Sequence, residues 1–459
     1  MSRPLAFFAL LAVPACVPAR SAMFGPVGDD VERRVGVRPA WRSGSPDGRV
    51  QAVVGALLAK PLDRDAVVRI ALAHSARLQA SFQRLGIAAA AIADATVLEP
   101  TEVDVQYKRD LDGDGSEIEL DVVQDVLGLL QLGQRRGIAN AELRGTRARV
   151  VAETVALVAR AETAFYDVVA AEQTLELWQT AFDASAAAAE ISERQRGAGN
   201  IHALDLSRQQ DVREVARLEL GRAQVDVELR REALNEVLGL TGDATRWTTT
   251  ARLPDLPAAA PAVDALETEA VAASLELAGL RADAEAAAGR VGVARVRTFL
   301  PELGVGVAAT RREDGAWEAG PALRVGLPIF TWGAGTRARA GAELARAQAE
   351  LVAVATELRA ETRAARQRLL GAHAQARHVR EVLLPLREQT LTQAVLQYNA
   401  MNLSTFELLQ ARKDQVEAGR QYIDALRRYW IATAEVAALR RGALPGRLGA
   451  GAIEEGEHR

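Results

Sequence analysis

The sequence predicts a mainly α-helical protein that carries two β-hairpins and is built as two tandem structural repeats. Alanine runs at residues 186–189 and 286–288 favour helix, because alanine has the highest helix propensity. Two other regions alternate apolar and polar residues with a period of two, which is the pattern of a strand with one polar face. The same order of patterns returns after roughly 200 residues, as expected of a tandem duplication.

The composition excludes several classes of protein. The chain has 459 residues, of which 49% are hydrophobic and 25% charged, so it buries a large core and is not disordered. Its formal net charge of −4 argues against nucleic-acid binding. The single cysteine, Cys16, excludes an intramolecular disulfide and a cysteine-based zinc site. No apolar run reaches the roughly 18 to 20 residues of a membrane-spanning helix.

The first 15 residues are predicted to be a signal peptide. Arg3 is followed by an apolar segment, residues 5–13, that is too short to span a bilayer. Cys16 follows directly, as in a bacterial lipobox, so we expect a lipoprotein whose Cys16 carries lipid, including palmitate. Pro14 is unusual for that motif, and a short hydrophobic N-terminus with an inert cysteine is the alternative.

The first repeat is predicted over residues 62–242, after an irregular, Gly-, Pro- and Arg-rich lead-in at residues 16–61. Helical spacing of apolar residues covers residues 63–95, and long helices are predicted over 141–196 and 203–238. The hairpin between them covers residues 101–123. Its apolar residues, Val103, Val105, Tyr107, Ile118, Leu120 and Val122, alternate with the polar residues Glu102, Asp104, Gln106, Glu117, Glu119 and Asp121.

The second repeat is predicted over residues 263–441, after a proline-containing linker at residues 243–262. It has the same order: a helix over 263–296, a hairpin over 302–330, a long helix over 336–400, a turn, and a last helix to residue 439. A flexible tail is expected over residues 442–459.

Individual residues match between the repeats. Asn200 corresponds to Asn402, Val103 to Val305, and Leu120 to Leu323. Two separate hairpins in one chain leave strand edges that they cannot close into a barrel alone, so a membrane barrel here requires other subunits.

Two segments resemble the outer membrane efflux protein family, the TolC-like exit ducts. Residues 320–333, GPALRVGLPIFTWG, resemble the family's second-repeat strand and its aromatic-Gly turn into a helix. Residues 398–411, YNAMNLSTFELLQA, resemble its helix-turn-helix tip. Met401 stands where the family usually has glycine, and Leu403 where some members have arginine. The resemblance covers residues 62–439.

The resemblance implies a trimer whose strands form one transmembrane barrel and whose coiled-coil helices form a tunnel in the periplasm. The implied function is that of the outer-membrane channel of a tripartite efflux or type I secretion system in a Gram-negative bacterium. This is a passive duct with a gated periplasmic end and no cofactor. The implied partners are a periplasmic adaptor (membrane fusion) protein, an inner-membrane RND or ABC-type pump, and outer membrane lipid.

Three groups of site residues follow. The polar face of the first hairpin is expected to line the barrel lumen and favour cations, with solvated charges above the membrane as the alternative: Glu102, Asp104, Glu117, Glu119 and Asp121. The resemblance implies an adaptor-docking function for the helical tips: Gly197, Gly199, Asn200, His202, Met401, Asn402 and Ser404. It also implies a periplasmic gate: Glu407, Asp205, Tyr398 and Gln410.

Other motifs are better explained without a site. Asp110, Asp112 and Asp114 resemble the start of a calcium loop, but the flanking strands favour an acidic hairpin turn. His373 and His378 are five residues apart, so they do not share a helix face as i, i+4 ligands do, and are interpreted as packing or surface residues. No nucleophile elbow, P-loop or dinucleotide fingerprint is present, so an enzyme is not expected.

The alternative function is a structural coiled-coil protein of the cell envelope without channel activity. A plain coiled coil needs a sustained heptad and has no need of two amphipathic hairpins at matched positions. The transported substrate, whether metal, drug or protein, and the pump that the channel serves are not encoded in a visible motif.

Overall fold

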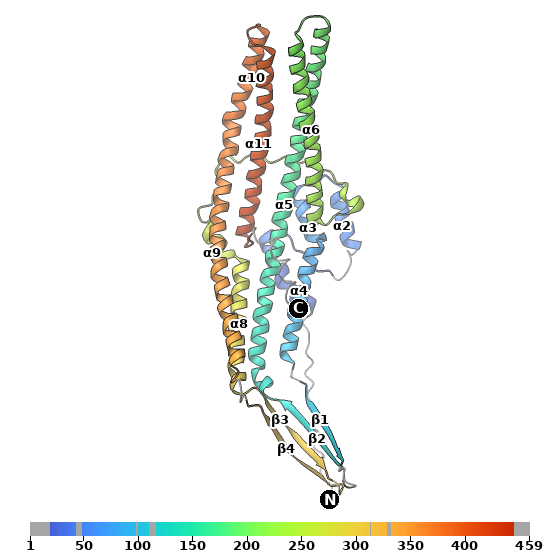
Figure 1. Cartoon of the computed structure of the whole chain (residues 1–459), viewed down its shortest axis with the longest axis vertical. Helices are drawn as coiled ribbons and strands as arrows, with labels where there is room; N and C mark the ends of the chain where they lie inside the picture. Colours follow the sequence, from blue (N-terminus) through green and yellow to red (C-terminus); the bar gives the residue numbers. More distant parts are fainter. Residues whose placement is uncertain are drawn as a thin grey trace. The chain divides into compact units, whose positions relative to one another are not determined.

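The computed structural model describes residues 19–42, 48–97, 100–109, 116–312, 314–327 and 332–444. Helices dominate, and four strands lie side by side in one sheet (Figure 1). The chain divides into two compact units, each made of three segments. Unit 1 comprises residues 1–27, 82–150 and 276–354, and unit 2 comprises residues 28–81, 151–275 and 355–459.

Unit 1 contains the antiparallel sheet, in the order β1-β2-β3-β4. The first hairpin is β1 (Glu102–Arg109) and β2 (Ser116–Asp125), and the second is β3 (Leu303–Arg311) and β4 (Trp317–Val325). β2 pairs with β3, which joins the hairpins, with Leu120 opposite Ala309. Both predicted hairpins are therefore present, and they form one continuous sheet.

Ion pairs join two helices that belong to unit 1. They are α8 (Leu275–Phe299) and the first part of α5 (Leu127–Gly197). Arg149 pairs with Asp283 at 2.7 Å and Arg144 with Glu285 at 2.6 Å. α9 (Ala334–His378) follows β4 through Trp332 and Gly333, which both have positive φ, so the predicted aromatic-Gly turn is present.

Unit 2 contains two helical hairpins. The second part of α5 turns into α6 (Ala203–Leu238), and α10 (Leu384–Asn399) turns into α11 (Thr405–Arg440), as Figure 1 shows. Glu193 pairs with Arg213 across the first hairpin at 3.5 Å. Arg387 pairs with Asp414 across the second at 2.8 Å. Each hairpin thus has an ion pair between its two helices.

A break at the same place interrupts the shorter helix of each repeat. α3 (Arg64–His74) ends at Ser75 before α4 (Ala76–Thr96), and α7 (Leu266–Ala273) ends at Ser274 before α8. The predictions of single helices over 63–95 and 263–296 are therefore wrong at one residue each. Both serines take a ψ near that of extended backbone, 114° and 119°.

Each break contacts the turn that follows a long helix, at Gly239 after α6 and at Gly442 after α11. His74 Nδ1 lies 3.2 Å from the carbonyl oxygen of Leu238, just before Gly239. In the second repeat, the amide of Leu275 donates to the carbonyl of Gly442 at 2.9 Å. In the second repeat the break frees the amide of Leu275 for this contact, which a continuous helix would keep for itself. In the first repeat the contact is made by the His74 side chain.

The predicted irregular lead-in is wrong. Residues of that segment form α1 (Arg20–Val35) and α2 (Gly48–Leu58), and α1 contains Pro26. Met23, Val27 and Val31 are four residues apart and buried, so they form the apolar stripe of a helix. The content of glycine and proline concealed this spacing.

Three further boundaries differ from the predictions. α5 begins at Leu127, 14 residues before the predicted start at Ala141, because the Asp125 carboxylate accepts from the amides of Leu127 and Gly128 and caps the helix. A π-helical segment, Val379–Leu383, separates α9 from α10. The first residues of the predicted tail are packed, since Ala443 and Leu444 are buried, and residues 445–459 lie outside the described residues.

The linker between the repeats is fastened to the helices of unit 2. Apart from the 3₁₀ turn Gly242–Thr245, it has no regular structure up to α7. Side chains of the second repeat contact its carbonyl oxygens: Trp430 Nε1 donates to Pro254 at 2.9 Å and Arg380 to Leu256 at 2.9 Å. His373 Nε2 lies 3.0 Å from the carbonyl of Pro257, and its ring packs on Tyr429. His373 is thus a buried packing residue, as interpreted from its spacing.

Candidate functional site

The sheet has one polar and one apolar face. Side chains alternate along each strand, and the register places Asp104 opposite Asp121 and Gln106 opposite Glu119. All five acids predicted for the lumen therefore lie on one face: Glu102, Asp104, Glu117, Glu119 and Asp121. Small residues of the second hairpin complete this face: Gly304, Gly306, Ala308, Gly320 and Ala322.

Two basic side chains offset part of the negative charge of the acidic face. Lys108 Nζ pairs with Glu119 at 2.5 Å. Arg324 pairs with Glu102 and lies 3.8 Å from Glu302. These two pairs lie at opposite ends of β1, and Asp104 and Asp121 lie between them. Arg324 was not assigned to this face from the sequence, although its alternation with Leu323 and Val325 provides the signal.

Glycines permit close approach of β3 to β2. A Cβ atom on Gly306 would collide with the carbonyl of Val122, and one on Gly304 would lie 2.6 Å from Val123 Cγ1. Only glycine fits at such positions without displacement of the neighbouring strand. The alternating glycines of β3 are thus explained by strand packing.

The opposite face of the sheet is apolar and exposed. Val105, Val307 and Leu323 are each about half exposed or more. The aromatic residues Tyr107 and Trp317 lie on the same face near the hairpin turns, and both are exposed. A contiguous exposed apolar face of this kind marks contact with a partner or a membrane.

The two helical tips have the same backbone geometry. At the first, the amide of Asn200 donates to the carbonyl of Gln195 at 2.8 Å, and Gly199 has φ 79°. At the second, the amide of Asn402 donates to the carbonyl of Gln397 at 2.9 Å, and Met401 has φ 60°. This is the left-handed C-terminal turn in which glycine usually occupies the residue with positive φ. At the second tip that residue is Met401.

The two following helices start differently. Ser404 caps α11, and the Glu407 carboxylate accepts from the Ser404 amide at 3.0 Å, which completes a capping box. His202 occupies the corresponding cap position of α6 and makes no side-chain cap. The bonds from the backbone and hydroxyl of Ser404 lower the pKa of Glu407.

The predicted gate residues lie near these tips. Asp205 lies 3.8 Å from Arg208 within α6. Gln410 donates to Asp414 at 2.9 Å, one turn along α11. Arg208 also lies over the ring of Phe406, 5.0 Å from its centroid, which joins the two hairpins. Arg208 was not identified from the sequence, because no local pattern connects it with α11.

The remaining candidates show no metal centre. In the described ranges, no group of three or more His, Cys, Asp or Glu residues would hold a metal ion. Asp110, Asp112 and Asp114 of the loop that resembles a calcium site, and Cys16 of the predicted lipobox, lie outside the described residues. Within the part of the chain that the structure describes, no helix meets the length and hydropathy of a bilayer span.

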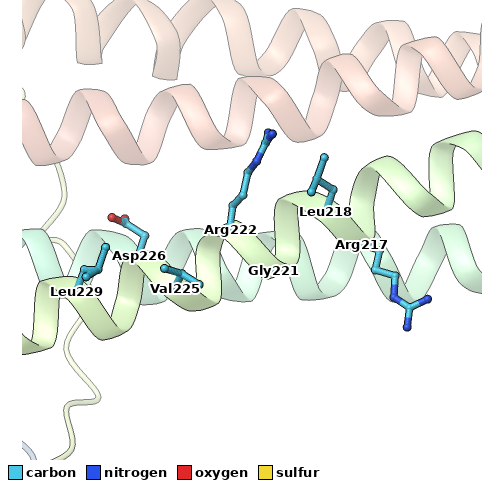
Figure 2. Close-up of a pocket in the computed structure, with 7 residues that line it drawn as sticks. All are labelled: Arg217, Leu218, Gly221, Arg222, Val225, Asp226 and Leu229. Carbon is cyan, nitrogen blue, oxygen red and sulfur yellow. The ribbon is translucent and has the colours of Figure 1, made fainter.

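A shallow hollow of about 500 Å³ lies along one face of α6 (Figure 2). The exposed side chains of Leu218, Val225 and Leu229 line it, and Gly221 leaves room between them. Arg217, Arg222 and Asp226 flank this apolar stripe. All the lining residues come from one helix, so the hollow is a helix surface rather than an enclosed ligand site.

Comparisons with known proteins identify the class. No known family profile matches the sequence. The outer membrane protein VceC from Vibrio cholerae matches 87% of this chain and 97% of its own at a TM-score of 0.65 and 16% identity. The CmeC outer membrane channel from Campylobacter jejuni matches 87% of each chain at a TM-score of 0.62 and 13% identity. The chain therefore has the fold of the TolC-like outer membrane channels.

One similarity in sequence is more specific. The cobalt-zinc-cadmium resistance protein CzcC from Cupriavidus metallidurans is 27% identical over 294 residues, which are 63% of this chain and 67% of CzcC. The resemblance to the outer membrane efflux proteins is thus confirmed. The two predictions that accompany it, an outer-membrane location and a function without catalysis, agree with the outer membrane protein VceC and the outer membrane channel CmeC.

Proposed function

We propose that this chain is the outer-membrane channel of a tripartite efflux or type I secretion system. It acts as a passive trimeric duct from the periplasm to the exterior. The observation that carries the proposal is the sheet: one face is exposed and apolar, the other is acidic. In the described residues β1 pairs with β2 alone and β4 with β3 alone, so two edges stay open. Open edges are not tolerated in a bilayer, whereas three copies of this sheet close a twelve-stranded barrel.

The two faces support this arrangement. In the barrel the apolar face contacts outer membrane lipid and the acidic face lines the lumen. The exposed apolar stripe of α6, Leu218, Val225 and Leu229, supports helix packing against a second copy of the chain. A structural coiled-coil protein would require neither face on the sheet.

Passive flow through the duct requires neither nucleotide nor cofactor. The energy for transport and the cargo therefore come from the proposed partners. A periplasmic adaptor docks on the two tips and connects the duct to an inner-membrane RND or ABC-type pump. The similarity to a cobalt-zinc-cadmium resistance protein supports divalent metal ions as cargo. An acidic lumen raises the local concentration of such cations.

The gate is proposed at the same end. Glu407 and Asp205 form acidic rings in the trimer, and Tyr398 tethers the closed state. Gln410 lies one helical turn after Glu407 on α11 and belongs to the same proposed gate. Three carboxylates that converge on an axis raise one another's pKa. The capping box of Glu407 opposes that rise, because the bonds from Ser404 favour the charged form. The bonds from Ser404 therefore favour a charged ring, and a charged ring attracts divalent cations.

The central experiment uses the full-length protein purified from outer membranes. We expect heat-modifiable migration at the size of a trimer and conductance in planar bilayers. A chromosomal deletion should sensitise the host to cobalt, zinc or cadmium, and the wild-type chain should restore tolerance. A stable monomer without conductance would support the structural alternative instead.

Two substitutions test the gate separately from the fold. Glu407→Gln removes the charge but retains a capping side chain, so it should abolish block by divalent cations without loss of helicity. Tyr398→Phe should raise the open probability. Glu388→Gln, in the first half of α10 and away from the tip, is the matched control. Unchanged block and open probability in both gate variants would refute the gate and leave the duct intact.

A further inference from the structure

Three helix ends meet at one end of the sheet. α5 begins just after β2, α8 ends just before β3, and α9 follows β4. The strand ends are adjacent because β3 pairs with both β2 and β4 up to these ends. Bulky apolar side chains are exposed there, and we call them the junction cluster: Leu129 and Leu130 on α5, Phe299 on α8, and Leu327 and Trp332 between β4 and α9. Exposed apolar and aromatic side chains at the ends of barrel strands are typical of the border between hydrocarbon and headgroups.

The helix segments beside the junction cluster lack acidic residues. Residues 126–141, 286–301 and 326–342 contain no Asp or Glu, and each of their charged residues is an arginine. The whole chain, by contrast, has a formal net charge of −4. The three segments therefore form a local excess of positive charge in an acidic protein.

Three of these arginines, which we call the junction arginines, have no acidic partner. Arg136 on α5, Arg295 on α8 and Arg337 on α9 are exposed. None of the three forms an ion pair in the part of the chain that the structure describes. Arg339, two residues further along α9, pairs with Glu343 and is not included. The junction arginines thus present positive charge that the chain itself leaves uncompensated.

Two junction arginines share a helix face with a residue of the junction cluster. Arg136 follows Leu129 by two helical turns on α5, and Arg295 precedes Phe299 by one turn on α8. At 1.5 Å per residue, these pairs are about 6 to 10 Å apart along the helix. The headgroup layer of a bilayer is roughly 5 to 8 Å thick, and long arginine side chains reach along a helix surface. When the cluster lies at the edge of the hydrocarbon, the guanidinium groups lie at the depth of the lipid phosphates.

The opposite end of the sheet has a different charge pattern. There Arg312 pairs with Glu318 at 2.7 Å, and Lys108 pairs with Glu119 at 2.5 Å. Acids of the same chain offset these cations, whereas none offsets the junction arginines. The difference indicates that an external anion is recognised at the helix end of the sheet.

We infer that the junction arginines bind the phosphate groups of anionic phospholipids, such as phosphatidylglycerol, in the periplasmic leaflet of the outer membrane. This inference rests on the proposed function, because it takes the sheet as part of a barrel wall whose helices extend into the periplasm. Arginine suits this role, since its planar guanidinium donates two parallel hydrogen bonds to a phosphate. Basic residues beside a membrane surface attract anionic headgroups, each by about fivefold.

Brominated lipid tests the inference, because bromine atoms quench the fluorescence of nearby tryptophan. The full-length trimer is reconstituted in phosphatidylcholine vesicles that contain increasing fractions of brominated phosphatidylglycerol. The signal that disappears in Trp332→Phe reports lipid at the junction. We expect wild type to prefer phosphatidylglycerol to brominated phosphatidylcholine by at least fivefold at this place. High salt should reduce the preference, because it screens exposed charges.

Matched variants separate charge from structure. Replacement of all three junction arginines by glutamine should reduce the preference to about onefold. Replacement of the same three by lysine keeps the charge and should retain at least half of the preference. The control replaces Arg33, Arg246 and Arg428 by glutamine; these exposed arginines belong to unit 2, and the loss of charge is the same. The control should behave like wild type.

The outcomes distinguish this inference from the proposed function. Conductance in pure phosphatidylcholine bilayers and heat-modifiable migration report the duct without anionic lipid. If wild type conducts but shows no preference, or if the glutamine variant keeps it, lipid recognition is refuted while the duct stands. Loss of the trimer in the glutamine variant would show that the junction arginines contact a neighbouring subunit, which also refutes the inference. If wild type neither assembles nor conducts, the proposed function fails.

Discussion

Arg324 and Glu102 form an ion pair although they lie on β4 and β1, the two edge strands of the sheet. Two strands separate them, so the two long side chains meet across the polar face of the sheet. Gly304, which pairs with Arg324, has no side chain to stand between them. The pair therefore links the two edge strands within a single chain.

The ion pair between Arg324 and Glu102 should influence the ion selectivity of the channel. Arg324→Gln releases Glu102 and Glu302, so we expect a stronger preference for cations, read as a shift of the reversal potential in a KCl gradient. Glu102→Gln should shift it in the opposite direction. Arg339→Gln, an exposed arginine on α9, is the control. Equal reversal potentials for all four proteins would show that this face does not line the conducting path.

Gly306 should be essential for the barrel. An alanine methyl group there would collide with the backbone of Val122, so Gly306→Ala should prevent assembly of a heat-modifiable trimer. Gly320 lies on the same face, but a Cβ atom there meets nothing within 4 Å, so Gly320→Ala should assemble normally. Normal trimer yield for Gly306→Ala would mean that the strands are further apart than described.

Arg34 should stabilise unit 2 through two carbonyl groups. Its Nη1 donates to Ala273 at 3.1 Å and to Arg441 at 2.7 Å, at the ends of α7 and α11. Arg34→Ala should cost about 2 kcal/mol, the typical effect of losing hydrogen bonds to a charged group. Arg33→Ala, one residue away and largely exposed, should cost under about 0.5 kcal/mol. Denaturant unfolding followed by circular dichroism would separate the two.

Glu162 should make stability depend on pH. Burial raises its pKa, and the nearby Arg441 and Arg64 only partly oppose this. The folded state therefore favours the protonated carboxyl. The resulting stabilisation is complete below the unfolded pKa of 4.5 and disappears as the pH rises through the raised folded pKa.

Melting curves from pH 4 to pH 8 test this prediction. Glu162→Gln should be less sensitive to rising pH than wild type. Glu190→Gln, exposed and paired with Arg194 on the same helix, should follow the wild-type curve. Parallel curves for wild type and Glu162→Gln would contradict a raised pKa.

Periodicity predicted the strands well because each has one polar and one apolar face. The alternation of Val103 with Glu102 and Asp104 is a local signal, and so is the glycine turn at Gly199. The helix break at Ser75 has no such signal, because the chain around it has good helix formers and the break is stabilised by a distant turn at Gly239. Contacts between distant segments decide such details, and one sequence does not encode them as a pattern.

The candidate site residues show the same difference between local signals and contacts between distant segments. The five acids predicted for the lumen lie on one face of the sheet, as their alternation within one hairpin indicated. Arg324 and Arg208 were missed because each acts on a different element of the fold, β1 and α11 respectively. The helix in the lead-in was missed for another reason: Pro26 and the glycines obscured the spacing of Met23, Val27 and Val31.

The matching breaks at Ser75 and Ser274 mark the chain as two copies of one structural unit. A half-length ancestor with one such unit would have needed six identical copies to build the barrel that three copies build in the proposed duct. All six of its tips would have been the same. In a chain with two such units alternate tips can differ, and here one tip has glycine and the other methionine at the left-handed position.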